Sequence, residues 1–319
     1  MNRTRRLQKK VFWLIAALLA GLAAWINLPA ISRLFDGSAD RIAALPPSPG
    51  FRKGERILIL SPHPDDETLC CGGLIQQAQQ AGAKVYVAWI TAGDGFEFDA
   101  ALTQRVADPT PQDMQKLGNL RAAEAKRAVS VLGVPAERTF MLGYPDGGLF
   151  QLFTTHYDEP LTNKHTGVDR VYVQGALVPG HAYTGRNLES DIGSLLNRVQ
   201  PDQVLAPAPQ DFHADHHTLS YIALRLMAQR EQENRLRFWV VHGGLEWPIP
   251  KGLHENLPLT VPPLASKLPW ERLDVTPEQQ KVKLAAINTY RTQTEVMGRF
   301  MRAYVRSNEL VSPEPLAEP

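Results

Sequence analysis

Short apolar runs alternate along the chain with longer stretches in which apolar positions recur every three or four residues. The short runs predict buried strands, and the longer periodic stretches predict amphipathic helices. Predicted strands cover residues 57–60, 84–91, 139–142, 204–206 and 237–241, and predicted helices cover 67–81, 117–132, 188–199, 218–231 and 277–297. Strands that alternate with helices form βαβ units. We therefore predict an α/β fold with a Rossmann-like, mostly parallel sheet flanked by helices.

The N-terminal region follows a different pattern. Residues 11–28 form an uncharged, mostly apolar stretch, and five basic residues precede it within the first ten positions. Such a stretch predicts a transmembrane helix, and the basic flank keeps its start in the cytoplasm. Residues 1–35 are thus expected to form a signal anchor that places the rest of the chain outside the cytoplasmic membrane. The alternative is secretion after cleavage near Gly21-Leu22-Ala23.

Composition divides the remaining chain. A Pro-rich segment over residues 36–54 predicts a semi-extended linker, residues 55–308 form the main domain, and residues 309–319 predict a disordered tail. Residues 149–186 lack a clear periodicity, and loops of this length are often functional.

Charge and cysteine content exclude some classes of protein. Beyond residue 10 the chain holds 29 basic and 33 acidic residues, which argues against a nucleic-acid surface. The only cysteines, Cys70 and Cys71, are neighbours. Adjacent cysteines bridge only with strain, so we expect a packed pair in the first helix and no disulfide framework.

Two clusters of histidine and aspartate follow two of the predicted strands. Ser61-Pro62-His63-Pro64-Asp65-Asp66-Glu67 comes after the first strand, and Asp211-Phe212-His213-Ala214-Asp215-His216-His217 comes after the fourth. Ligands of parallel sheets bind beyond the carboxyl ends of the strands, where both clusters fall. His63, Asp66 and one or both of His213 and His216 would suit zinc, although iron or another divalent ion fits the same donors. Asp65 would then serve as a general base.

These clusters and several further motifs resemble those of the LmbE/PIG-L family of metal-dependent de-N-acetylases. The resemblance rests on Pro62-His63-Pro64-Asp65-Asp66-Glu67 with Cys71-Gly72-Gly73, on Thr91-Ala92-Gly93-Asp94-Gly95, on Arg121-x-x-Glu124, on Leu142-Gly143-Tyr144-Pro145-Asp146-Gly147-Gly148-Leu149, and on His213-x-Asp215-His216. It covers about residues 55–300.

The resemblance implies a role for each matching residue. It makes His63, Asp66 and His216 the zinc ligands and Asp65 the general base. His213 would stabilise the oxyanion or protonate the leaving amine, with Asp215 orienting its imidazole. Arg121 and Asp146 would contact sugar hydroxyls.

The implied activity is removal of the acetyl group from an N-acetylglucosaminyl conjugate, with release of acetate. The expected membrane anchor favours a lipid-linked or envelope glycan, and residues 149–186 would shape the aglycone side of the pocket. Two alternatives stay open: a related metal-dependent amide or ester hydrolase, and a catalytically silent, membrane-tethered glycan-binding protein. The oligomeric state cannot be predicted from these patterns.

Overall fold

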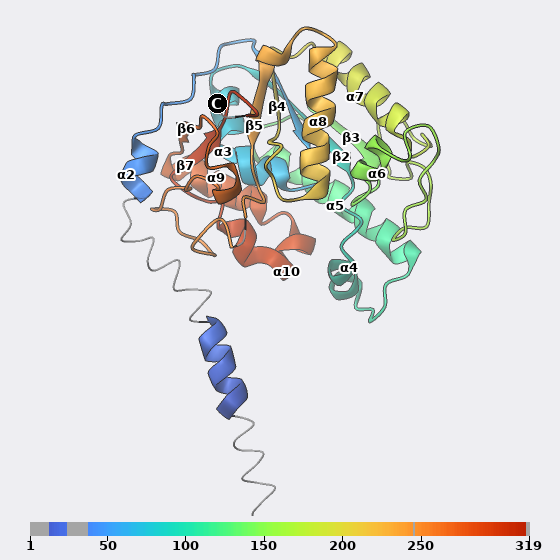
Figure 1. The fold of residues 1–319 in the computed structure, drawn as a ribbon, viewed down its shortest axis with the longest axis horizontal. Coiled ribbons are helices and arrows are strands. Elements are labelled where there is room, and N and C mark those ends of the chain that lie inside the picture. Colours follow the sequence, from blue (N-terminus) through green and yellow to red (C-terminus); the bar gives the residue numbers. More distant parts are fainter. Residues whose placement is uncertain (1–12, 24–37, 245, 317–319) are drawn as a thin grey trace, which may run out of the picture.

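The computed structural model describes residues 13–23, 38–244 and 246–316, and its centre is a parallel sheet (Figure 1). The five strands lie in the order β3-β2-β1-β4-β5, and all neighbours are parallel. The predicted α/β fold with a mostly parallel sheet is confirmed. The strands are β1 (Arg56–Ser61), β2 (Lys84–Thr91), β3 (Thr139–Tyr144), β4 (Gln203–Pro207) and β5 (Leu236–Trp239).

Helices cover both faces of the sheet because the strands are added first on one side of β1 and then on the other side. The crossovers from β1 to β3 run one way, and those from β3 back past β1 to β5 run the other way. Right-handed crossovers then place their helices on opposite faces. One group is α3 (Asp66–Gln80), α5 (Pro111–Val131) and α9 (Pro277–Ile287), and the other is α6 (Leu149–Phe153), α7 (Gly185–Val199) and α8 (Ala214–Ala228).

The remaining elements lie around this core. Strands β6 and β7 form a separate antiparallel pair, and α10 packs against α4, α5 and α9. The bounds of these elements are α2 (Ser38–Ala43), α4 (Glu97–Gln104), α10 (Arg291–Arg302), β6 (Glu271–Asp274) and β7 (Asn308–Val311), with short 3₁₀ turns at Ala136–Arg138, Glu233–Arg235 and Pro263–Ala265.

Three predictions near the ends of the domain need correction. The long helix predicted over residues 277–297 is two helices, α9 and α10, because the Tyr290 side chain turns into the core between them. Residues 309–311 of the tail predicted to be disordered belong to β7, whose residues are buried and contact β6 and β5. The predicted linker contains α2 and a bridge from Pro47 to Arg272, so part of it packs on the domain.

The predicted single-pass membrane protein is contradicted. Residues 13–23, in the N-terminal region, are described as helix. Among the described residues, no helix is both long enough and apolar enough to cross a membrane. Residues 1–12 and 24–37, which belong to the predicted anchor region, lie outside the described part of the chain.

The two cysteines are packed in the first helix of the domain, as predicted, but they are also joined to each other. Cys70 and Cys71 are buried in α3 and form a vicinal disulfide. The backbone leaves helical geometry at Cys71, with φ −132° and ψ 15°, so the adjacent side chains can meet. The expectation of a pair without a disulfide was wrong.

Candidate active site

The two His/Asp clusters meet because β1 and β4 are neighbours in the sheet. The direction of the crossovers reverses between these strands, and such a switch point opens a crevice at the carboxyl edge. His63 follows β1, and His213 and His216 stand at the start of α8, directly after β4. Residues separated by about 150 positions in the sequence are thereby brought into contact.

Three donor atoms form a compact triangle at this edge. Asp66 Oδ2 lies 3.1 Å from His63 Nδ1 and 3.1 Å from His216 Nε2. The two histidine nitrogens lie 3.3 Å from each other. Two imidazole nitrogens and one carboxylate oxygen are the donors that three-ligand zinc sites use. Of the residues predicted as metal ligands, the structure therefore brings all three together.

Each histidine of the triangle has a carboxylate at its other ring nitrogen. His216 Nδ1 lies 3.1 Å from Asp211, and His63 Nε2 lies 3.1 Å from Asp146 and 3.2 Å from Asp215. Carboxylates in such positions fix the ring orientation of metal-binding histidines and increase their basicity. Burial lowers the pKa of His216, but the Asp211 and Asp66 charges outweigh it and raise the pKa to about 9. The surroundings of the triangle thus favour a cation, as a divalent metal requires.

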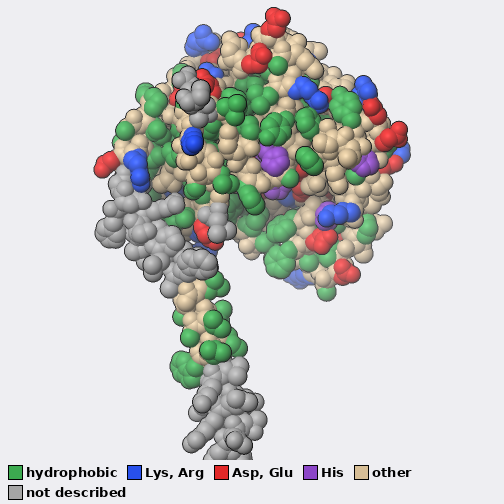
Figure 2. Space-filling model, in the orientation of Figure 1, with side chains coloured by type: hydrophobic (Ala, Val, Ile, Leu, Met, Phe, Trp, Pro, Cys, Tyr) green, Lys and Arg blue, Asp and Glu red, His purple; other side chains and the backbone are tan. Residues whose placement is uncertain are grey.

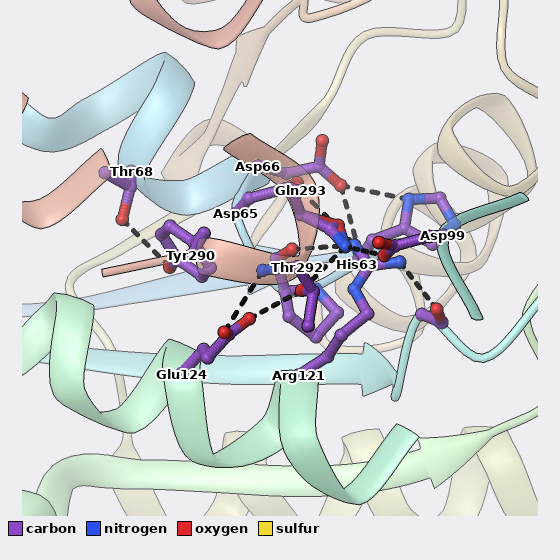
Figure 3. Close-up of polar contacts among 12 residues, drawn as sticks. His63, Asp65, Asp66, Thr68, Asp99, Arg121, Glu124, Tyr290, Thr292 and Gln293 are labelled. Atoms are coloured by element: carbon purple, nitrogen blue, oxygen red, sulfur yellow. Dashed lines mark hydrogen bonds and ion pairs between the residues drawn. The ribbon is translucent and has the colours of Figure 1, made fainter. Parts of the chain in front are cut away.

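Asp65 lies beside the triangle in an uncommon backbone conformation. Its φ of 121° is rarely adopted by residues other than glycine, and strain of this kind concentrates at functional sites. Burial raises the pKa of the Asp65 carboxyl well above 3.8, and the Arg121 guanidinium opposes this shift. Arg121 lies 3.3 Å from Asp65 and also donates to the backbone carbonyls of Pro64 and Gly93. Figure 3 shows Arg121 reaching from α5 to this turn.

Arg121 and Asp146, which were expected to contact sugar hydroxyls, contact other residues of the site. Arg121 and Asp146 line the cavity, as a substrate contact requires, but both are already engaged with site residues. Arg121 holds Asp65, and Asp146 contacts His63 while accepting a hydrogen bond from Gly95 at 2.9 Å. Glu124, predicted to match a motif with Arg121, accepts hydrogen bonds from Thr292 instead.

His213 and Asp215 are also arranged differently from the expectation. The Asp215 carboxylate accepts hydrogen bonds from Gly147 and Leu149 and contacts His63. Among the described residues, no ion pair joins this carboxylate to His213. The Asp215 backbone N–H instead donates to His213 Nδ1 at 3.3 Å. A neutral His213 then carries its proton on Nε2.

A buried network fastens the turn that carries Asp65 and Asp66. Glu67 accepts hydrogen bonds from Trp89 Nε1 at 2.9 Å, from Ser61 Oγ at 3.1 Å and from the backbone N–H of Asp65 at 3.2 Å. The Tyr290 hydroxyl donates to the other oxygen of the same carboxylate. Figure 3 shows Tyr290 pointing toward this turn from the far C-terminal part of the chain. The network therefore ties the reactive turn to a residue more than 200 positions away.

A cavity of about 350 Å³ opens at these residues. His242, which follows β5, lies against the rings of His213 and His216, at centroid distances of 5.3 Å and 4.9 Å. Figure 2 shows histidine side chains at the surface with hydrophobic side chains around them. Besides the polar residues described above, the cavity is lined by His242, His165, Leu69, Phe96, Val241, Met297, Phe300 and Met301.

Sequence reasoning missed several of these residues. Asp211 stands two positions before His213, and His242 follows the fifth predicted strand, so strand ends alone could have indicated both. Tyr290, Met297 and Phe300 belong to a helical stretch whose pattern gives no sign of a site. The 149–186 segment contributes His165 to the cavity, where its Nδ1 lies 2.9 Å from Glu97.

The fold and the site together define a class of protein. It is an α/β protein that carries, at the switch point of its parallel sheet, a His/Asp cluster able to hold a metal ion and a buried carboxyl group beside it. The sequence model of GlcNAc-PI de-N-acetylase (PIG-L) matches residues 58–227, more than half of the chain. The chain belongs to this family, and the resemblance predicted from its motifs is confirmed.

Relatives of this chain carry the names of deacetylases. A 1D-myo-inositol 2-acetamido-2-deoxy-alpha-D-glucopyranoside deacetylase of Actinosynnema mirum is 25% identical over 280 residues, which cover 81% of this chain and 88% of the relative. A protein of the same name from Tsukamurella paurometabola is 42% identical over 82 residues, which cover 25% of this chain. That match spans only 26% of the Tsukamurella protein, and matches to two Rhodococcus proteins of this name span 32% of each.

The fold is also found among solved structures. The N,N'-diacetylchitobiose deacetylase from Pyrococcus horikoshii superposes with a TM-score of 0.50 at 20% identity, over 81% of this chain and 84% of that chain. At this level of identity the similarity concerns the fold.

Proposed function

We propose that this protein is a metal-dependent hydrolase that removes the acetyl group from an N-acetylglucosaminyl conjugate, producing acetate and a free amine. One observation carries the proposal: the His63, Asp66 and His216 donor atoms converge beside the buried Asp65 carboxyl in an open cavity. The names of the family and of its relatives support the acetylated amino sugar as the substrate class.

The residues present fit a divalent ion, for which zinc is our first candidate and ferrous iron the second. His63 Nδ1, Asp66 Oδ2 and His216 Nε2 would hold it, and the site would keep an open position. An ion bound there lowers the pKa of coordinated water and polarises a carbonyl oxygen.

Asp65 is the proposed general base. Its carboxylate would take a proton from the attacking water as the water oxygen forms a bond to the acetyl carbon. The same proton would pass to the departing nitrogen when the carbon–nitrogen bond breaks, so acetate and an amine leave. A raised pKa suits such a group because it must both accept and donate a proton. Arg121 would act as a positioning residue that keeps the carboxylate directed at the cavity.

His213 would stabilise the oxyanion that develops on the acetyl oxygen. Burial, together with the charges of His63 and His216, lowers the pKa of His213 to about 4. Its ring is therefore neutral near pH 7, and the proton on Nε2 is available to donate a hydrogen bond. Preorganised donors of this kind are among the largest contributions to catalysis of acyl transfer.

The aglycone is not specified by this site. The expected lipid-linked or envelope glycan rested on a membrane anchor, and it loses that support with the anchor. Asp146, which already contacts His63 and Gly95, has one face on the cavity and could still contact a sugar hydroxyl.

The test uses the full chain stripped with a chelator and then reloaded with zinc or ferrous iron. N-acetylglucosaminyl glycosides should give acetate and free amine in equal amounts only after reloading. Matched non-sugar acetamides and acetate esters should react more slowly. Full activity in the stripped protein, or a preference for non-sugar substrates, would contradict the proposal.

A further inference from the structure

A second cavity adjoins the first. It has a volume of about 510 Å³ and lies between α10 and the segment around Lys251. Met297 and Phe300 line both cavities, and these two residues form the ridge between them. A molecule bound beside His63, Asp66 and His216 could therefore extend over this ridge into the second cavity.

Cationic side chains line the second cavity on two sides. Arg299 and Arg302 come from α10, and Lys251 comes from the loop that follows β5. Glu246 and Glu295 also line the cavity, which leaves the cations in excess by one. Within the described parts of the chain, no salt bridge is formed by any of the three cations.

Lys251 is a partly buried cation of the second cavity. Its Nζ donates to the Trp247 carbonyl at 3.2 Å and lies 4.6 Å from the centroid of the Phe300 ring. Burial lowers the pKa of the Lys251 ammonium to about 8, and the nearby Glu246 opposes this change. The nearest partners of this ammonium are thus a carbonyl and an aromatic ring, and an anion in the cavity could accept a further, charge-assisted hydrogen bond from it.

We infer that the second cavity is an anion-binding subsite, which takes a phosphate or carboxylate carried by the aglycone of the N-acetylated substrate. The sugar would occupy the first cavity, the aglycone would pass over Met297 and Phe300, and its anionic group would meet Lys251, Arg299 and Arg302. This inference rests on the proposed deacetylase function and assigns that function a class of substrate.

The chemistry of the ridge agrees with such a path. Met297 and Phe300 are half-buried apolar side chains on a helix that leaves regular geometry at Met297. A thioether and an aromatic ring bind the apolar face of a sugar ring or a short alkyl chain well. Phosphate and carboxylate share the required charge, and arginine can contact either one through two parallel hydrogen bonds.

The experiment compares three matched N-acetylglucosaminyl glycosides, with a neutral alcohol, a carboxylate or a phosphodiester at the same position of the aglycone. Deacetylation is measured with metal-loaded full chain, the double variant Lys251→Met with Arg302→Gln, and the control Lys281→Met. Lys281 is an exposed lysine on α9 that does not line either cavity. The ratio of kcat/KM for anionic over neutral glycosides should fall by about tenfold or more in the double variant, because the loss of even one of its two charge-assisted hydrogen bonds has this scale. It should stay unchanged in Lys281→Met, and whether the carboxylate or the phosphodiester gives the larger ratio identifies the natural group.

Two other outcomes distinguish a failure of the proposed subsite from a failure of the proposed deacetylase function. If all three glycosides are deacetylated equally well by the wild type and the double variant, the subsite is wrong and the deacetylase function stands. If no glycoside is deacetylated, the proposed function fails, and calorimetric titration with the phosphodiester and carboxylate glycosides then decides on the subsite. Weaker binding to the double variant than to Lys281→Met would support it, and equal or absent binding would overturn it.

Discussion

Two regions of the chain build the candidate site, and they differ in chemistry and origin. Residues 58–227, which the family model covers, supply the triangle of His63, Asp66 and His216. They also supply Asp65 and His213, which follow strands, and Arg121, which reaches the site from α5. Residues beyond 227 supply His242, Met297, Phe300 and the buried hydroxyl of Tyr290. The first region holds polar groups for the reaction, and the second region presents a largely apolar wall that would select the aglycone.

This difference indicates which substitutions should change the rate of the reaction and which should change substrate binding and preference. Substitutions among the strand ends should alter metal binding or the chemical step. Substitutions in α10 should alter KM and substrate preference. Tyr290 is the exception that connects the regions, because it belongs to the second and contacts the turn of the first.

Asp211→Asn should have the largest effect among the indirect changes. It weakens the carboxylate contact to His216 Nδ1, and loss of such a contact lowers metal affinity by about 10–100-fold. Competition with a metal indicator measures this affinity, and excess metal should restore part of the activity. Asp202→Asn, at the opposite edge of the sheet, is the control. Unchanged metal affinity in Asp211→Asn would contradict the proposed ligand His216.

Arg121→Gln should move the acid limb of the pH profile. Removing the guanidinium removes the group that opposes the upward shift in the pKa of Asp65, so the base becomes protonated at higher pH. Activity should therefore be lost at a higher pH as the solution is acidified, and kcat/KM near neutrality should fall by about tenfold. Arg127→Gln, an exposed change on the same helix, should leave the profile in place. An identical acid limb in both variants would remove Arg121 from the role of positioning Asp65.

Much of this arrangement follows from sequence, and the reasons are physical. One His/Asp cluster comes soon after the run 57–60 and the other after the run 204–206, and parallel strands deliver their carboxyl ends to one edge, so a metal site there could be predicted. The choice of His216 over His213 as the third ligand came from the family resemblance. Asp215 could not be assigned correctly because a two-residue spacing to His213 permits either a side-chain or a backbone contact. Phe300 and Tyr290 could not be found because long-range packing, and no local pattern, brings α10 to the cavity. The vicinal disulfide depends on a local departure from helical geometry at Cys71, which the amino-acid pattern does not indicate.

Tyr290→Phe tests the connection between the two regions. The variant loses a donor to the buried Glu67 carboxylate, so the free energy of unfolding should fall by about 1–2 kcal/mol. Because the same carboxylate also holds the Asp65 backbone, kcat should fall several-fold while metal binding persists. Denaturant unfolding and steady-state kinetics measure the two effects. Tyr221→Phe, at an exposed tyrosine, is the control, and equal stability in both variants would argue against the network.

Phe300→Ala should have the smallest effect on the chemical step. The ring stacks against His242 at 6.0 Å and lines both cavities, so its loss should raise KM several-fold with little change in kcat. Phe150→Ala, at an exposed phenylalanine on α6, should change neither constant. A large fall in kcat with unchanged KM would mean that the apolar wall takes part in the reaction.

The most direct test of the central claim is to measure metal content and acetate release together in Asp65→Asn and His216→Ala. Asp65→Asn should keep its metal and lose activity by about 10²–10⁴-fold, because it lacks only the base. His216→Ala should lose both metal and activity. Wild-type turnover in Asp65→Asn, or full metal content with activity in His216→Ala, would contradict the account.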